Sequence, residues 1–303
     1  MPILTFTRGA DPRHRLGVLT AGDAILDLSE WARSVPRPVP FDSSDMVSLI
    51  AAGPSAWSEI AQVARSDGPT VAREEVRLLA PIPRPRKNVV CVGWNYRAHF
   101  AEAQALHNRG QDFPEHPTFF TKAPTSVIGP YDPIPFNPAV SSQIDWEAEL
   151  AVVIGRRGIN IPETDADQYV FGYMIANDIS ARDLQRQYGG QYFKGKSLDG
   201  SCPCGPWITT ADEVDPHSLH ITSRVNGATK QESTTELLYF NIPRLIASLS
   251  LGMTLEPGDI IVTGTPPGVG FGRTPPEFLK PGDLLETEIE HLGVLRNPVQ
   301  ASA

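Results

Sequence analysis

The stretch Gln143-Ile-Asp-Trp-Glu-Ala-Glu-Leu-Ala-Val-Val-Ile-Gly155 sets three acids at alternate positions before an apolar run. The run over 150–154 is typical of a buried strand. Because side chains alternate along a strand, we expect Asp145, Glu147 and Glu149 on one face. Unpaired buried charges are very costly, so this face needs a counter-charge. Hard divalent cations such as Mg²⁺, Mn²⁺ or Ca²⁺ suit carboxylate oxygens, and the alternative is an exposed edge strand with a solvated acidic face.

A fourth acid strengthens the prediction of a metal site. Asp178 ends a second apolar run, residues 170–176, and Ser180 is placed to cap a helix over 181–187. Asp178 could itself be only a helix cap. Acids at two separate strands nevertheless favour a shared metal cage over two unrelated caps.

The composition predicts a globular, strand-rich protein. The 303 residues are 41% apolar and 20% charged, and the 29 prolines indicate many loops and few long helices. A net charge of −9 argues against a general nucleic-acid binder. No secretory signal and no apolar run of membrane-spanning length is recognisable. The three cysteines, Cys91, Cys202 and Cys204, form no disulfide or zinc pattern, which favours a reducing cytoplasm.

Two regions are predicted along the chain. Residues 1–75 are expected to form a small α+β domain with a helix over 46–65, and residues 76–303 the main domain. Prolines in the segment 80–87 favour an extended connection. In the main domain we expect helices over 94–107 and 244–251, a mobile polar loop over 108–116, and strands over 88–93, 118–122, 147–154, 170–176, 207–210, 220–225, 260–263 and 284–289.

Several polar residues are candidates for chemistry. His99 and Glu102 are three apart on a predicted helix, an arrangement that makes a general base, although surface pairs of this kind are common. Lys196 lies in a Gly-hinged loop and could bind an anion. Arg182 and Gln185 share one face of the helix predicted after Asp178 and could bind a carboxylate; the alternative is a solvated helix face.

A glycine-rich loop, residues 263–272, follows the predicted strand over 259–262. No helix can start promptly after it, which disfavours a dinucleotide or phosphate loop. Glycines that let the backbone approach a ligand, with the hydroxyl of Thr265 as a contact, fit better.

Together these motifs resemble the fumarylacetoacetate hydrolase family, in its acylpyruvase and 2-hydroxyhepta-2,4-diene-1,7-dioate isomerase-like branch. The resemblance spans about residues 78–298. It rests on five motifs in order, namely Val92-Gly-Trp-Asn-Tyr-Arg-Ala-His99, Asp145-Trp-Glu-Ala-Glu-Leu150, Asn177-Asp-Ile-Ser-Ala-Arg-Asp183, Gly195-Lys-Ser197 and Pro257-Gly-Asp-Ile-Ile-Val-Thr-Gly-Thr-Pro266.

The resemblance implies an α+β fold with a mixed β-sandwich or roll core, usually in a homodimer. It implies Mg²⁺ or Mn²⁺, with Ca²⁺ in some members, held by Glu147, Glu149 and Asp178. Asp145 then supports the site without binding the metal. The remaining candidates take two roles: His99 and Glu102, on a lid, activate water, and Lys196, Arg182 and Gln185 contact substrate or order the site.

The reaction we expect is hydrolysis of a 2,4-dioxo acid. The substrate's carboxylate and 2-oxo group chelate the metal, activated water attacks the distal carbonyl, and the metal and Lys196 neutralise the developing enolate. Alternatives on the same metal site are decarboxylation of oxaloacetate-like acids and isomerisation of hydroxydienedioates. A non-enzymatic, Ca²⁺-stabilised binding domain is a further alternative. The expected partner is a small oxo acid, with no nucleic acid and no membrane.

Overall fold

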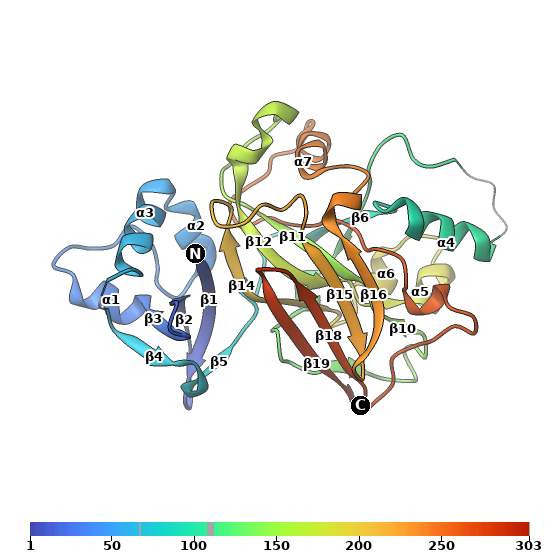
Figure 1. The fold of residues 1–303 in the computed structure, drawn as a ribbon, viewed down its shortest axis with the longest axis horizontal. Coiled ribbons are helices and arrows are strands. Elements are labelled where there is room, and N and C mark those ends of the chain that lie inside the picture. The colour runs from blue at the N-terminus through green and yellow to red at the C-terminus, as the bar shows by residue number, and fades with distance from the viewer. Residues whose placement is uncertain (67, 108–111, 303) are drawn as a thin grey trace.

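A computed structural model describes residues 1–66, 68–107 and 112–302. The fold is the predicted strand-rich α+β type, with two main sheets and short helices (Figure 1). The larger sheet runs in the order β4-β3-β2-β1-β14-β12-β11-β17-β6-β7, with β5 paired to β1 and β8 to β14. Its strands are β1 (Pro2–Arg8), β2 (Asp11–Leu19), β3 (Ala24–Asp27), β4 (Thr70–Ala72), β5 (Val76–Leu78), β6 (Val89–Gly93), β7 (Thr118–Lys122), β8 (Val127–Ile128), β11 (Ala148–Ile154), β12 (Val170–Asn177), β14 (Cys202–Thr210) and β17 (Ile260–Val262).

The second sheet has the order β16-β15-β18-β19-β9, and β10 pairs with β13 in a separate two-stranded piece. The bounds are β9 (Ile134–Phe136), β10 (Ile144–Asp145), β13 (Ser180–Ala181), β15 (His220–Val225), β16 (Ala228–Thr234), β18 (Leu284–Ile289) and β19 (Gly293–Ala301). The α-helices are α1 (Leu28–Ser34), α2 (Met46–Ala51), α3 (Pro54–Val63), α4 (Arg97–His107), α5 (Arg182–Gln187), α6 (Phe193–Lys196) and α7 (Ile242–Ser250). The 3₁₀ helices are η1 (Arg73–Glu75), η2 (Pro124–Ser126), η3 (Glu163–Tyr169), η4 (Thr235–Leu237) and η5 (Gly270–Gly272).

Strand β11 lies at the centre of the molecule and is buried along its whole length. Leu150 and Val152 point into the apolar core shared with β15, β18 and α7, whereas Ala151 and Val153 point into the core shared with the N-terminal elements. This alternation follows from the two-residue period of a strand. A strand covered on both faces needs an apolar sequence throughout, which explains the run over 150–154.

The N-terminal strands continue the large sheet, because Ile3 of β1 pairs with Ile208 of β14. The predicted helix over 46–65 is two helices, α2 and α3. It breaks at Gly53, whose φ is 83°, directly before Pro54. A positive φ and a proline both interrupt a helix. The division of the chain at residue 75 stays a prediction.

Further details differ from the prediction, among them the start of one helix and the cap of another. The helix expected from Trp94 begins at Arg97 as α4, and Trp94 itself has a φ of 59°. The predicted cap at Ser180 is wrong: Ser180 lies in β13, its hydroxyl donates to the carbonyl of Asp178, and α5 has no side-chain cap. Of the predicted loop over 108–116, residues 108–111 lie outside the described part of the chain.

Helices α4, α5 and α6 lie at one end of the molecule, and the N-terminal elements lie at the other (Figure 1). The short helices α5 and α6 pack beside β7 and β13, near the ends of β11 and β12. In the described chain, no helix combines the length and the apolar composition that crossing a membrane requires.

Candidate active site

Three buried carboxylates meet at the ends of the central strands. Glu147, Glu149 and Asp178 each offer an oxygen, and these atoms lie within 4.8 Å of one another. Pairing of β11 with β12 sets Ala148 opposite Asn177, which brings the flanking acids together. The backbone N–H of Asp178 also donates to the carbonyl of Glu147 at 2.9 Å. The strand pairing therefore builds the cluster that the sequence predicts.

Buried cations neutralise two of these carboxylates. Arg182 Nη2 lies 2.6 Å from Glu147 Oε1, and Lys196 Nζ lies 2.6 Å from Glu147 Oε2 and 2.7 Å from Asp178 Oδ2. Burial alone would raise the pKa of Glu147, but Lys196 and Arg182 outweigh it and lower the pKa to about 2. Burial acts to lower the pKa of Lys196, yet the charges of Asp178 and Glu147 raise it. Glu147 and Lys196 are therefore charged at neutral pH.

A second lysine, absent from the sequence prediction, completes the pairing of Asp178. Lys122 is fully buried at the end of β7, and its Nζ lies 2.8 Å from Asp178 Oδ1 and 3.0 Å from the carbonyl of Ile179. The signal in the sequence is a lysine that ends the apolar strand over 118–122. A lysine is almost never fully buried unless it is paired, so this position needed a carboxylate.

Glu149 is the carboxylate left without a cation. It accepts a hydrogen bond from the backbone N–H of Gly264, and it makes no ion pair with any described residue. Burial raises the pKa of Glu149 well above its usual range, and the nearby charges of Asp178 and Glu147 raise it further. An unpaired charge in this position is costly unless a cation joins it.

The charge balance of the site fits a divalent cation. Within the described residues, four buried acids face three buried bases, namely Asp145, Glu147, Glu149 and Asp178 against Lys122, Arg182 and Lys196, which leaves one excess negative charge. The donor set consists of oxygens alone, which Mg²⁺, Mn²⁺ and Ca²⁺ prefer. The residues present therefore fit such an ion, with Glu147, Glu149 and Asp178 as the groups that would hold it.

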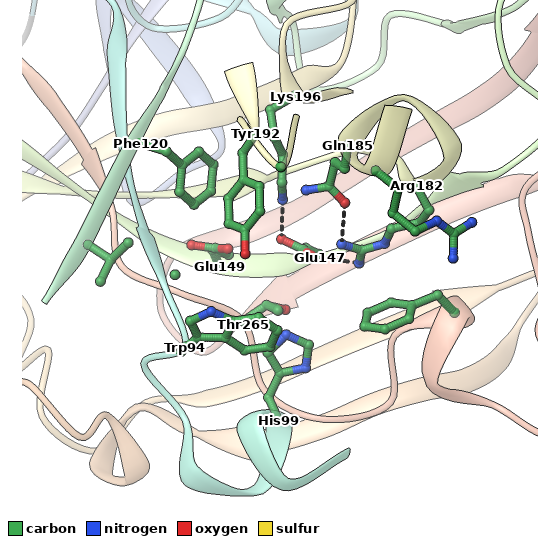
Figure 2. Close-up of a pocket in the computed structure, with 15 residues that line it drawn as sticks. Trp94, His99, Phe120, Glu147, Glu149, Arg182, Gln185, Tyr192, Lys196 and Thr265 are labelled. Carbon is green, nitrogen blue, oxygen red and sulfur yellow. Dashed lines mark hydrogen bonds and ion pairs between the residues drawn. The ribbon is translucent and has the colours of Figure 1, made fainter. Parts of the chain in front are cut away.

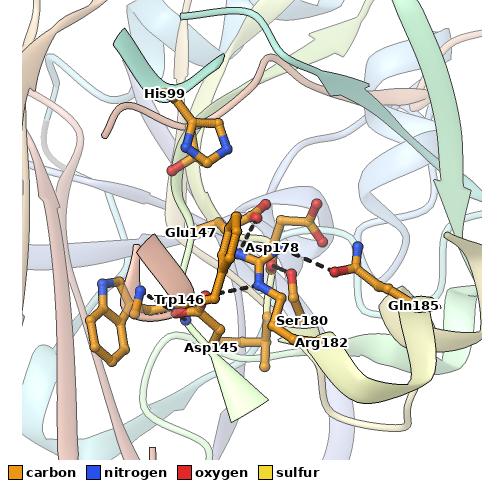
Figure 3. A network of polar contacts seen from close by, with 12 residues as sticks. His99, Asp145, Trp146, Glu147, Asp178, Ser180, Arg182 and Gln185 are labelled. Carbon is orange, nitrogen blue, oxygen red and sulfur yellow. Dashed lines mark hydrogen bonds and ion pairs between the residues drawn. The ribbon is translucent and has the colours of Figure 1, made fainter. Parts of the chain in front are cut away.

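Asp145 has a different role from the other acids. Its carboxylate accepts from Arg182 Nε at 2.8 Å, from the N–H of Gly270 at 2.6 Å and from the N–H of Phe271 at 3.0 Å (Figure 3). The strand predicted over 147–154 begins at Ala148 as β11, and Asp145 lies in the separate strand β10, so the three acids do not alternate along one strand as expected. Asp145 therefore fixes Arg182 and the glycine-rich loop.

His99 and Glu102 form the predicted pair on α4. His99 Nδ1 lies 3.3 Å from Glu102 Oε2, and the N–H of Gly268 donates to the same carboxylate at 3.2 and 3.4 Å. The imidazole stacks on Trp94, with ring centroids 5.4 Å apart, and points from α4 into the pocket (Figure 2). Because Glu102 accepts from the Nδ1–H, the lone pair of His99 is left on Nε2, where it can accept a proton.

These groups open into one pocket of about 550 Å³. Its walls carry aromatic rings from four separate segments, namely Trp94, Phe120, Tyr192 and Phe271. Most of the predicted site residues line it: His99, Glu147, Glu149, Arg182, Gln185, Lys196 and Thr265. Gln185 accepts from Arg182 Nη1 at 3.1 Å, and the Thr265 hydroxyl donates to the carbonyl of Ala148 at 3.0 Å. Asp178 and Glu102 lie behind the lining, hydrogen-bonded to groups that form it.

Comparisons with known proteins identify the family of this chain. The family model described as fumarylacetoacetate (FAA) hydrolase C-terminal matches residues 88–300, and the chain belongs to that family. It is 49% identical to the oxaloacetate tautomerase YisK of Bacillus subtilis (strain 168) over 74% of this chain and 73% of the relative. It is 43% identical to the mitochondrial oxaloacetate tautomerase Fahd2a of Rattus norvegicus over 92% of this chain and 84% of the relative.

One solved structure that matches this chain contains a metal ion. The maleylpyruvate hydrolase of Sphingobium sp. SYK-6, determined in complex with manganese(II) and pyruvate, superposes with a TM-score of 0.78. Its sequence is 31% identical, and the match covers all of both chains. The comparisons confirm the predicted family, the strand-rich fold and the prediction that the protein is an enzyme of this family.

Proposed function

We propose that this protein is a divalent-metal-dependent tautomerase of 2-oxo dicarboxylic acids of the oxaloacetate type. The observation that carries the proposal is the buried carboxylate cluster, which lacks one positive charge, in a chain 49% identical to an oxaloacetate tautomerase. This is an isomerisation, and it belongs with the alternative reactions that the sequence left open. Hydrolytic C–C cleavage, the reaction first expected, receives less support from these relatives.

The metal would be held by Glu147, Glu149 and Asp178, and Mg²⁺ or Mn²⁺ is proposed. When bound, such an ion acts as a Lewis acid that polarises the 2-oxo group and stabilises negative charge on its oxygen. The manganese in the related hydrolase structure supports this choice. The same oxygen donors also suit Ca²⁺, so Ca²⁺ is tested alongside Mg²⁺ and Mn²⁺.

Tautomerisation moves one proton and breaks no C–C bond. The enol loses its O–H proton, the C2–O bond becomes a carbonyl, and C3 gains a proton. His99, which lines the pocket, would carry the proton on Nε2, with its ring oriented through Nδ1 by Glu102. Lys196 and Arg182 fix Glu147 in its charged form, and Lys196 offers its positive charge to the developing enolate.

The remaining pocket residues position the acid. Arg182 and Gln185 are hydrogen-bonded to each other on one face of α5, and Thr265 is fixed by the edge of β11. The aromatic rings of Trp94 and Phe271 limit the access of water, which strengthens the interactions between charges.

Hydrolysis of an acylpyruvate is the second candidate. The pair of His99 and Glu102 favours it, since such a dyad can activate water, and a maleylpyruvate hydrolase shares the fold. The non-enzymatic, Ca²⁺-binding alternative has no support from the relatives, which are named as enzymes.

The distinguishing experiment is product identification. The purified protein with Mg²⁺ or Mn²⁺ is given enol-oxaloacetate, an acylpyruvate and a hydroxydienedioate, and the products are followed by NMR and enol absorbance. We expect accelerated ketonisation of oxaloacetate without stoichiometric release of pyruvate. Rapid formation of pyruvate and a free acid from the acylpyruvate, with no effect on the enol, would assign hydrolysis instead. A homodimer and a cytoplasmic location are also proposed, and sedimentation and cell fractionation test them.

A further inference from the structure

Three permanently cationic side chains line the pocket, and they differ in how they are neutralised. They are Arg182, Arg186 and Lys196. Arg182 contacts Asp145 and Glu147, and Lys196 contacts Glu147 and Asp178, each at 2.6 to 2.8 Å. Both are buried, and each already pairs with two carboxylates of the cluster, so neither reaches outward to pair with a carboxylate at the far end of a substrate.

Arg186 stands apart from these two. Its Nη2 donates to the side-chain carbonyl of Gln143 at 2.6 Å, a neutral partner, and it makes no ion pair with any carboxylate in the described chain. The side chain is exposed at the pocket wall. A guanidinium carries five N–H donors in a planar fork, so one neutral hydrogen bond leaves most of its capacity open.

The position of Arg186 sets what it can reach. On α5 it follows Arg182 by four residues, so both occupy one helix face about 6 Å apart along the axis. Arg182 touches Glu147 at the carboxylate cluster, which places Arg186 one turn farther out on the same wall. The walls between are largely aromatic, with Tyr192 and Phe271 among them. A carboxylate at the outer end of a substrate would therefore lie near Arg186, a cation that pairs with no carboxylate in the described chain.

We propose that Arg186 binds the distal carboxylate of the substrate and so selects dicarboxylic over monocarboxylic 2-oxo acids. The inference rests on the proposed function, because it takes the 2-oxo carboxylate end to lie at Glu147, Glu149 and Asp178. The second carboxylate of a four-carbon oxo acid, two carbons away, then extends along α5 toward the guanidinium. Arginine and carboxylate form bidentate, charge-assisted hydrogen bonds, which give both affinity and direction.

Binding of unreactive analogues tests the inference without turnover. Malate and lactate share a 2-hydroxy acid end and differ in the second carboxylate. Their dissociation constants are measured by calorimetry on the Mn²⁺-loaded protein for wild type, Arg186→Gln and the matched control Lys194→Gln. Lys194 is an exposed cation outside the pocket lining, so its variant reports the general effect of losing one charge.

We expect wild type to bind malate more tightly than lactate. Arg186→Gln should raise the dissociation constant of malate by about 10- to 100-fold, the range for a lost hydrogen bond to a charged group. The dissociation constant of lactate should not change. Lys194→Gln should change either constant by less than about twofold, as expected for a screened surface charge. Equal affinity of wild type for the two acids, or equal weakening of both by Arg186→Gln, would overturn the inference.

The kinetics separate this inference from the proposed function. If wild type ketonises enol-oxaloacetate and Arg186→Gln raises KM with little change in kcat, the proposed function and the role of Arg186 are both supported. If wild type is active and KM is the same in the variant, Arg186 does not bind the distal carboxylate, but the proposed function is still supported. If wild type is inactive on oxaloacetate while malate binding still depends on Arg186, the proposed reaction is wrong and the selectivity remains.

Discussion

Replacing Glu149 by Gln should raise the stability of the metal-free protein and abolish its stabilisation by metal. Glu149 is fully buried and makes no ion pair with a described residue, and burial with the neighbouring Asp178 raises its pKa. Such a carboxyl stabilises the fold most below its unfolded pKa. Its contribution is lost as the pH rises toward the folded pKa, so at neutral pH it destabilises. The amide of Gln keeps an oxygen to accept from Gly264 and carries no charge.

The expected magnitudes are large enough to measure. Relief of an unfavourably buried polar group is worth about 1–3 kcal/mol. For a chain of 303 residues, 1 kcal/mol corresponds to about 1.6 °C in Tm, so the metal-free variant should melt about 2–5 °C higher. At a metal concentration of 100 times Kd, the wild type gains about 2.7 kcal/mol, or about 4 °C, and the variant should gain almost none.

Differential scanning calorimetry of the chelated and the Mn²⁺-loaded proteins measures both effects. Glu74→Gln makes the same chemical change at an exposed position of the N-terminal region and should behave like wild type in both states. A Glu149→Gln protein that melts lower than wild type without metal would show that the carboxylate is well compensated. A full metal-induced shift in that variant would remove Glu149 from the ligand set.

Four other substitutions test the surroundings of the cluster. His99→Ala should slow ketonisation by about 10²–10⁴-fold, because it removes the proton carrier. Glu102→Gln should slow it less, because it removes only the group that orients His99. A near-normal rate for His99→Ala would refute this role. A β-carbon on Gly272 would lie 2.5 Å from Cδ of Glu102, so Gly272→Ala should displace this carboxylate. We expect kcat to fall, by no more than in Glu102→Gln, and Tm to stay the same. An unaltered kcat would argue against the contact. Lys122→Met should lower the free energy of unfolding by about 3–5 kcal/mol in urea titrations, because it removes one of the two cations that neutralise the buried Asp178. A loss under about 1 kcal/mol would contradict the pairing.

The strands were the most predictable part of the fold. Strands β15 and β18 match their predicted bounds, because alternation and flanking turns mark both ends. Strand β16 and the C-terminal strand β19 were missed. The sequence of β16 has little apolar character, and that of β19 contains Asn297 and Pro298 within the strand. Pairing with neighbours overrides such weak local preferences.

The candidate metal ligands were predictable because carboxylates at alternate strand positions carry their own electrostatic signal. The neutralising groups were harder to find. Lys122 is distant in sequence from Asp178, and only the neighbouring positions of β6, β7, α6 and β13 bring the two together. The role of Asp145 depends on a local break between two strands, which a two-residue period cannot reveal.

The most direct test of the central claim is a metal titration of ketonisation. The protein is freed of metal with a chelator, and the rate of enol-oxaloacetate loss is followed as Mn²⁺ is returned. We predict no activity above the metal-only background at the start and a rise to a plateau at one Mn²⁺ per chain, absent in Glu149→Gln. Full activity in the chelated protein would contradict a metal centre at Glu147, Glu149 and Asp178.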